Sequence, residues 1–217
     1  MHVLILDGHP DERRLVSALL DHYADSLQPS ATVQRIAVRD LSFDVNLRRG
    51  YGADQDWEAD LHDVGAAVTA CDHLVVGFPL WWGGEPARLK GLLDRVVLPG
   101  FAFRYRKKGP FWDRLLAGRS ADVIVTMDTP PWYLRAVYGD PVGRRWRRQV
   151  LGFCGFDPVR VFRFGPTRRG EAKQRIEGWQ AQVAKAAATA AALKRGTKLD
   201  GQSGRSDFGV AVAERRS

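Results

Sequence analysis

Along this chain, short runs of apolar residues alternate with longer segments in which apolar residues recur every three or four positions. The short runs are typical of buried strands, and the longer spacing is typical of helices with one buried face. The pattern predicts strands at Val3–Leu6, Thr32–Val38, His73–Gly77, Asp122–Thr126 and Pro158–Phe164. It predicts helices at Arg13–Leu27, Asp56–Ala70 (with Asp56 as N-cap), Ala87–Val97, Gly143–Phe153 and Arg169–Arg195.

Regular alternation of strands and helices favours an α/β fold, in which helices cover both faces of a parallel sheet. Short right-handed crossovers between parallel strands leave few topologies open. We expect a three-layer sandwich with a five-stranded parallel sheet in the order 2-1-3-4-5, whose ligand crevice lies where strands 1 and 3 separate. Residues 40–52 and 98–110 show no clear periodicity and are predicted to be loops.

Three unusual loops follow strands 1, 3 and 4: Gly8–Leu15, Pro79–Gly84 and Thr126–Tyr133. The carboxyl ends of parallel strands share one edge of a sheet, so we expect these loops to meet at one rim. The middle loop carries Trp81 and Trp82 before two glycines. Flat aromatic faces and close backbone approach suit a planar, polar-edged ring such as a flavin. Alternatively, both tryptophans cover the core or a dimer interface.

The first loop opens a helix, and helix N-termini bind anions. His9 and either Arg13 or Arg14 could therefore contact a phosphate, with a plain turn residue as the alternative for His9. Near the third loop, Tyr133 and Tyr138 are the proton donors expected at the rim. We take both tyrosines as candidate catalytic residues, and packing residues with bonded hydroxyls are the alternative.

Length and composition fit one domain, which we expect at residues 1–195 of the 217. Residues 196–217 are rich in glycine, serine and charged side chains and are predicted to be a disordered tail. No apolar run approaches the ~20 residues of a membrane span, and no export signal is recognisable. Both cysteines lie in apolar surroundings without metal-like spacing, so we expect free thiols, no metal site and a cytoplasmic location.

The net charge of +8 favours anionic small molecules as ligands. No zinc-finger spacing and no aromatic RNA-binding signature accompanies the basic clusters, so no nucleic-acid partner is predicted. The glycine-rich signatures of dinucleotide and nucleotide-phosphate loops are missing, and so are the signatures of zinc proteases and serine hydrolases. The sequence motifs therefore exclude several common enzyme classes.

Three motifs carry a resemblance to a known family: GHP at residues 8–10, PLWWGGEPARLKG at residues 79–91 and FCGF at residues 153–156. Together they resemble the NAD(P)H:quinone oxidoreductases, a flavodoxin-like family that includes the modulators of drug activity and the ancillary subunits of bacterial potassium-efflux systems. The resemblance extends from about Val3 to Ala188. The motif at residues 79–91 is the most specific of the three.

The resemblance implies a tightly bound FAD or FMN, with FAD favoured. It implies that NAD(P)H is the co-substrate and that a quinone-like acceptor is reduced by two-electron hydride transfer in a ping-pong cycle. It also implies a homodimer, with each flavin near the subunit boundary. A regulatory or ancillary subunit that docks a membrane transport partner is the alternative on the same fold. A one-electron carrier fits poorly, because such carriers are usually acidic.

Position by position, His9 matches the family histidine beside the flavin phosphates. Pro79, Leu80, Trp81 and Trp82 match the segment whose backbone holds the ring, and Trp82 matches the aromatic residue under it. Backbone N–H groups around Gly83 are expected to face the flavin.

The remaining site positions lie in the third loop and around the acceptor. Thr126 matches the start of the third flavin loop, and Tyr138 falls where the best-known members carry a histidine thought to help charge relay. We expect Trp132 and Phe103 to form the walls of the acceptor pocket.

Two segments depart from the family pattern. The phosphate loop has Arg14, Leu15 and Val16 where the family usually has serine, an aromatic residue and asparagine. An arginine replaces a hydroxyl contact with a charge, and its geometry differs. The third loop has Met127 and Asp128 in place of a glycine pair, so their side chains are expected to crowd one edge of the flavin.

Overall fold

The computed structural model describes residues 1–51, 55–168 and 170–198. A five-stranded parallel sheet in the order β2-β1-β3-β6-β7 forms its centre. The strands are β1 (His2–Asp7), β2 (Thr32–Ala37), β3 (His73–Pro79), β6 (Ser120–Thr126) and β7 (Val159–Phe164). These are the five predicted strands in chain order, so the predicted fold class and the order 2-1-3-4-5 are confirmed.

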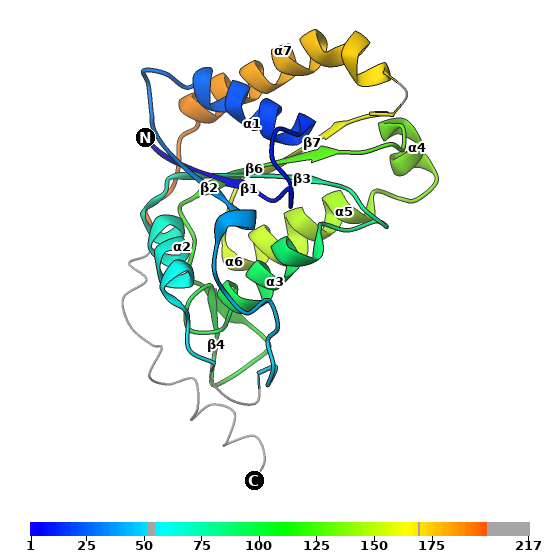
Figure 1. The fold of residues 1–217 in the computed structure, drawn as a ribbon. Coiled ribbons are helices and arrows are strands. Elements are labelled where there is room, and N and C mark those ends of the chain that lie inside the picture. Colours follow the sequence, from blue (N-terminus) through cyan, green and yellow to red (C-terminus); the bar gives the residue numbers. More distant parts are fainter. Residues whose placement is uncertain (52–54, 169, 199–217) are drawn as a thin grey trace.

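Helices cover both faces of the sheet, as Figure 1 shows. One face carries α1 (Leu15–Asp25) and α7 (Glu171–Ala192). The other carries α2 (Ala59–Ala70), α3 (Ala87–Val96) and the segment α5 (Pro141–Arg144), η2 (Arg145–Leu151) and α6 (Gly152–Cys154). Each face has its own core of buried apolar side chains. β3 is buried along its whole length, as expected for a strand covered on both sides.

Several elements differ from the predictions. The predicted loop at 98–110 contains β4 (Phe103–Tyr105), which pairs antiparallel with β5 (Trp112–Arg114). A 3₁₀ turn, η1 (Val38–Asp40), follows β2, and a short helix, α4 (Pro131–Ala136), follows the third loop. The helix predicted at residues 143–153 is interrupted by a π-helical turn, η2. The unpredicted strands and turns are short. The π-helical turn was not distinguished from an α-helix because the spacing of apolar residues is similar in both over so few residues.

The predicted capping role of Asp56 is wrong. Helix α2 begins at Ala59, and Glu58 is its N-cap residue. The backbone oxygen of Asp56 instead accepts a hydrogen bond from Arg95 Nη2 at 2.7 Å. The chain therefore stays extended past Asp56 because a buried guanidinium holds it there.

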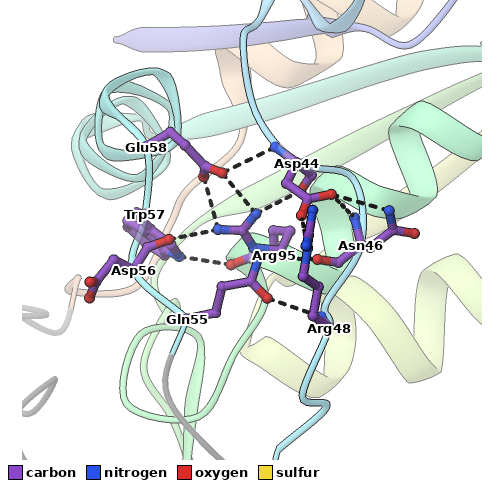
Figure 2. Close-up of polar contacts among 8 residues, drawn as sticks. All are labelled: Asp44, Asn46, Arg48, Gln55, Asp56, Trp57, Glu58 and Arg95. Atoms are coloured by element: carbon purple, nitrogen blue, oxygen red, sulfur yellow. Dashed lines mark hydrogen bonds and ion pairs between the residues drawn. The ribbon is translucent and has the colours of Figure 1, made fainter.

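Arg95 fastens the loop between η1 and α2 onto α3, as Figure 2 shows. Its side chain is fully buried. Its guanidinium donates to the backbone oxygen of Asp44 at 2.6 Å and to Glu58 Oε2 at 2.8 Å. Trp57 Nε1 donates in return to the backbone oxygen of Arg95 at 2.7 Å. One residue of α3 thus fixes two distant points of a loop that has little regular structure of its own.

The chain continues past α7 as far as the structure describes it. Lys198 Nζ lies 2.6 Å from Asp72 Oδ1, so this segment packs beside the start of β3. The predicted disordered tail lies outside the described residues from residue 199 onward, and the domain limit at residue 195 stays a prediction.

Within the described part of the chain, no helix combines the length and apolar character that a membrane crossing requires. The same residues contain no group of three or more His, Cys, Asp or Glu placed to bind a metal ion.

Candidate functional site

The three unusual loops meet at the carboxyl edge of the sheet. The backbone N–H of Gly8 donates to the oxygen of Gly77 at 2.7 Å, which joins the first loop to β3. The N–H of Leu80 donates to the oxygen of Thr126 at 2.8 Å, which joins the second loop to the third. The rings of His9 and Trp81 meet edge to face, with centroids 5.8 Å apart. Segments far apart in sequence therefore form one rim.

The second loop is a tight two-residue turn. Trp81 and Gly84 exchange backbone hydrogen bonds of 2.9 and 3.0 Å. The two residues between them both have positive φ, +50° for Trp82 and +83° for Gly83, which is the pattern of a type I′ turn. Glycine adopts this conformation freely, but a tryptophan there costs about 1–2 kcal/mol. Strain of this kind is concentrated at functional sites.

Packing in the core does not compensate for this strain, because the side chain of Trp82 is fully exposed. The N–H groups of Trp82 and Gly83 donate to no described residue. Apart from the two neighbouring residues of the chain, no atom lies within 4 Å of the position that a Cβ on Gly83 would occupy. The turn therefore offers an aromatic face, free N–H donors and open space. These properties fit a flat ring with polar edges such as a flavin.

The first loop is held by a buried carboxylate at the end of β1. Asp7 is fully buried, and it accepts hydrogen bonds from Ser17 Oγ at 2.7 Å, from the His9 N–H at 3.1 Å, and from Arg35 and Arg39 at 3.1 Å each. Burial alone would raise the pKa of Asp7. The donors, Ser17 foremost, outweigh burial and hold the pKa below its ordinary value. Asp7 is thus an anion that fixes the loop carrying His9.

The other predicted residues of the first loop lie around this anchor. Burial lowers the pKa of His9, so its imidazole is neutral at pH 7. Arg14 is exposed and is paired with Asp11, its Nε lying 2.8 Å from Asp11 Oδ2. Leu15 is the first residue of α1 and packs against the core beneath that helix. His9 contacts the second loop through its ring, which packs against Trp81.

The third loop turns one predicted side chain away from the rim. Thr126 and Met127 are buried, and Met127 belongs to the core on the face of the sheet that carries α2 and α3. Asp128 is exposed and accepts a hydrogen bond from Thr167 Oγ1 at 2.6 Å. Since Met127 points into the core, it leaves the rim open, and the crowding expected from that residue does not occur.

Aromatic side chains continue the rim along and beyond α4. Trp132 packs edge to face on Tyr133 with centroids 5.5 Å apart, and Tyr133 packs on Tyr138 at 5.3 Å. Trp132 and Tyr138 are largely exposed. Phe103 lies elsewhere: it is buried on β4 against Phe153, and Figure 1 shows β4 beyond α3 and α6, away from α4. Within one chain, the structure does not bring Phe103 to the rim.

Glu85 was missed by the sequence analysis. It follows the type I′ turn, and its side chain is almost fully buried. Its carboxylate is paired with Arg145 and accepts a 3.4 Å contact from Trp146 Nε1, both on the π-helical turn η2. The sequence did contain a signal for this pair. A single acid follows two glycines and precedes a proline, and an arginine cluster occurs much later in the chain. Glu85 links the strained turn to the buried Trp146 and the neighbouring Arg145 of η2.

Comparison with known proteins places these features in context. The model of a family described by its flavodoxin-like fold matches residues 1–188. An FMN-dependent NADH:quinone oxidoreductase of Cereibacter sphaeroides is 31% identical over 166 residues, which cover 68% of this chain and 76% of that protein. NAD(P)H dehydrogenase [quinone] 1 of Rattus norvegicus is 36% identical over 125 residues. That match covers 54% of this chain and only 44% of the rat protein.

A solved structure shares most of this architecture. The crystal structure of Smu.1420 from Streptococcus mutans UA159 superposes with a TM-score of 0.74 at 28% sequence identity, covering 87% of this chain and 100% of that one.

Proposed function

The chain belongs to the flavodoxin-like NAD(P)H:quinone oxidoreductase family, and from that premise we propose that it binds a flavin and uses NAD(P)H to reduce quinone-like acceptors. The observation that carries the proposal is the strained turn at Trp82 and Gly83, which presents an aromatic ring and free N–H donors to open space. A bound flavin supplies the hydride-accepting ring that the protein's own side chains lack.

The protein's contribution is to hold and orient that ring. Backbone groups from Pro79 to Gly83, with Trp82 against one ring face, form one wall of the proposed flavin site. Thr126, Met127 and Asp128 contribute their backbone at a second edge. We propose that His9, Arg14 and Leu15 lie beside the flavin phosphate, to which the neutral His9 ring can donate one hydrogen bond.

The acceptor and the nicotinamide would lie in turn against the aromatic side chains of the α4 region. Trp132 is proposed to exclude water from this face. Tyr133 and Tyr138 are the proposed proton donors for the reduced acceptor, because their hydroxyls are the titratable groups of this aromatic row. Phe103 remains a predicted pocket residue that the geometry of one chain does not support.

The flavin is proposed to be FMN or FAD, and the C. sphaeroides relative is named for FMN. The preference for FAD that follows from the family resemblance has no support in that name. Heat release of the flavin followed by chromatography against both standards identifies it.

The decisive experiment combines colour and turnover. The purified protein should be yellow, should bleach when NADPH is added without oxygen, and should regain its colour when a quinone is added. Initial rates at varied NADPH and quinone should give parallel double-reciprocal lines, as a ping-pong cycle requires. A protein that binds neither FMN nor FAD in a titration, or that binds flavin without NAD(P)H oxidation, would contradict the proposed activity.

We also propose a homodimer, supported by the exposure of Trp81, Trp82 and Trp132 along one edge of the chain. Light scattering coupled to size-exclusion chromatography should give twice the 24.2 kDa mass of the chain. A cytoplasmic location is proposed from the two free, buried cysteines, which suit a reducing compartment. Cell fractionation tests it.

A further inference from the structure

A basic cleft lies beside the first loop, between α1 and the end of β2. Its volume is about 480 Å³. Four arginines and two carboxylates contribute most of its lining, which consists of Glu12, Arg13, Arg14, Ser17, Ala18, Asp21, Arg35 and Arg39. Positive side chains thus outnumber negative ones on its surface, and they come from two separate parts of the chain.

The cleft is braced from behind by the buried carboxylate of Asp7. Arg35 and Arg39 each place one nitrogen 3.1 Å from Asp7 Oδ2, and Arg35 also pairs with Asp21. A guanidinium has five N–H donors, so one such contact leaves others unused. The Nε of Arg39 is buried and donates to no described residue. Asp7 therefore orients two guanidiniums without using up their donors.

Arg13 adds a side chain that has no other role in the fold. It is exposed, and it has no partner among the described residues. Its backbone is left-handed, with φ of +54°. This backbone conformation is unfavourable for arginine. An arginine whose side chain only faced solvent would have no need of it. Arg13 and Arg39 thus reach the cleft from two separate parts of the chain, and the Nε of Arg39 lies 3.8 Å from Asp40 Oδ1.

Guanidinium groups from several directions are the preferred partners of a phosphate dianion. In α/β folds that bind dinucleotides, an arginine near the ribose accommodates the extra phosphate of NADPH. We propose that this cleft binds the ribose 2′-phosphate of NADPH and makes NADPH the preferred co-substrate over NADH. The inference rests on the proposed function for its setting, but the cleft itself can be tested without it.

The first test measures binding alone. Adenosine 2′,5′-bisphosphate and 5′-AMP differ only in the 2′-phosphate, and calorimetry should show the bisphosphate binding about tenfold more tightly. Arg13→Asn removes the guanidinium and keeps a residue that tolerates positive φ. It should reduce that preference about fivefold. Arg49→Asn, at an exposed arginine of another loop, is the charge-matched control and should leave the preference unchanged. Equal affinity for the two nucleotides would overturn the inference, whatever the protein's activity.

The second test uses the holoenzyme. Arg13→Asn should lower kcat/KM for NADPH about fivefold and leave kcat/KM for NADH and the bound flavin unchanged. Arg39→Lys keeps a cation beside Asp7 but loses the planar set of guanidinium donors, so it should shift the same ratio in the same direction. If either variant instead loses flavin, the cleft serves the flavin phosphate and the inference is wrong. An equal loss with both co-substrates would also refute it. Absence of any turnover would count against the proposed function, and the calorimetry would still decide the cleft.

Discussion

At the scale of single residues, the most informative position is Trp82. Its backbone is left-handed and its side chain is fully exposed, so neither local preference nor core packing explains it. The sequence analysis identified this residue from its loop and its aromatic face. It could not identify the strain, because φ is set by the reciprocal hydrogen bonds of Trp81 and Gly84. The structure therefore adds a free-energy argument for a ligand.

Trp82→Gly separates stability from function. Glycine relieves the left-handed strain, so the free energy of unfolding should rise by about 0.5–1 kcal/mol in urea titrations. Flavin affinity should fall at least about tenfold, because the aromatic face is lost. Fluorescence titration with FMN measures the second effect. Unchanged affinity would contradict the assignment of Trp82 to the ring face.

Gly83→Val tests the neighbouring position. A β-branched residue at a φ of +83° should lower the free energy of unfolding by about 1–3 kcal/mol and weaken flavin binding. Gly178→Val is the matched control, because Gly178 lies in α7 with no atom within 4 Å of an added Cβ. That variant should stay within about 0.5 kcal/mol of the unaltered protein. Equal effects at both sites would show that the turn has no special role.

At the scale of elements, the arrangement of strands was predictable and the arrangement of loops was only partly so. β3 and β6 are apolar throughout because helices cover both of their faces, and such runs are conspicuous in a sequence. The meeting of three loops followed from the parallel order alone. The strands of the β4–β5 hairpin have three residues each, which is too short for a periodic pattern in the sequence. The partners of Arg95 could not be predicted either, because most of them are backbone oxygens, which every residue has.

Arg95 gives a prediction at this scale. Arg95→Leu removes the donors for Asp44, Asp56 and Glu58 (Figure 2), and leaves buried backbone oxygens unsatisfied. The free energy of unfolding should fall by about 2–4 kcal/mol. Lys90→Ala, which breaks an exposed pair with Asp94 on the same helix, should change it by less than about 1 kcal/mol. Urea titrations of both variants measure this difference. Similar losses in the two would show that the loop does not depend on Arg95.

At the scale of the whole molecule, a buried polar network lies toward the sheet edge opposite the rim. Tyr23 donates to Asp122 Oδ2 at 2.7 Å, and its hydroxyl lies 3.0 Å from His73 Nε2. Arg160 pairs with Asp122 through two nitrogens, and Arg195 donates to Ser120, which contacts His73 Nδ1. The network joins α1, three strands and the segment after α7. Its role is structural, because every member is bonded to another part of the fold.

His73 and Asp122 of this network, together with His9 and Asp7 of the first loop, predict how the stability of the fold depends on pH. Burial lowers the pKa of His73 and His9, so the unfolded chain binds more protons than the folded one below about pH 6.5. For Asp122, burial would raise the pKa, but the hydrogen bonds from His73 and Arg160 outweigh it. With Asp7, whose pKa is also lowered, Asp122 therefore stabilises the fold above about pH 4 and loses this contribution as the pH falls further.

Urea titrations between pH 7.5 and pH 3 test this linkage. The free energy of unfolding should begin to fall below about pH 6.5, with a slope of up to about 1.4 kcal/mol per pH unit for each histidine. The two aspartates should add to the slope below about pH 4. His9→Asn removes one histidine and should leave the part due to His73. A flat profile between pH 7 and pH 5 would contradict the burial of these imidazoles.

The burial of both cysteines has a chemical consequence for the proposed activity. Quinones are electrophiles that add to thiolates, so an enzyme that handles them risks arylation of its own sulfur atoms. Burial raises the pKa of Cys71 and of Cys154 to about 12, which keeps both as inaccessible thiols. Mass spectrometry after incubation with excess quinone should find no adduct on the native chain and adducts on both sulfurs in urea, as expected of a protein that tolerates its own acceptors.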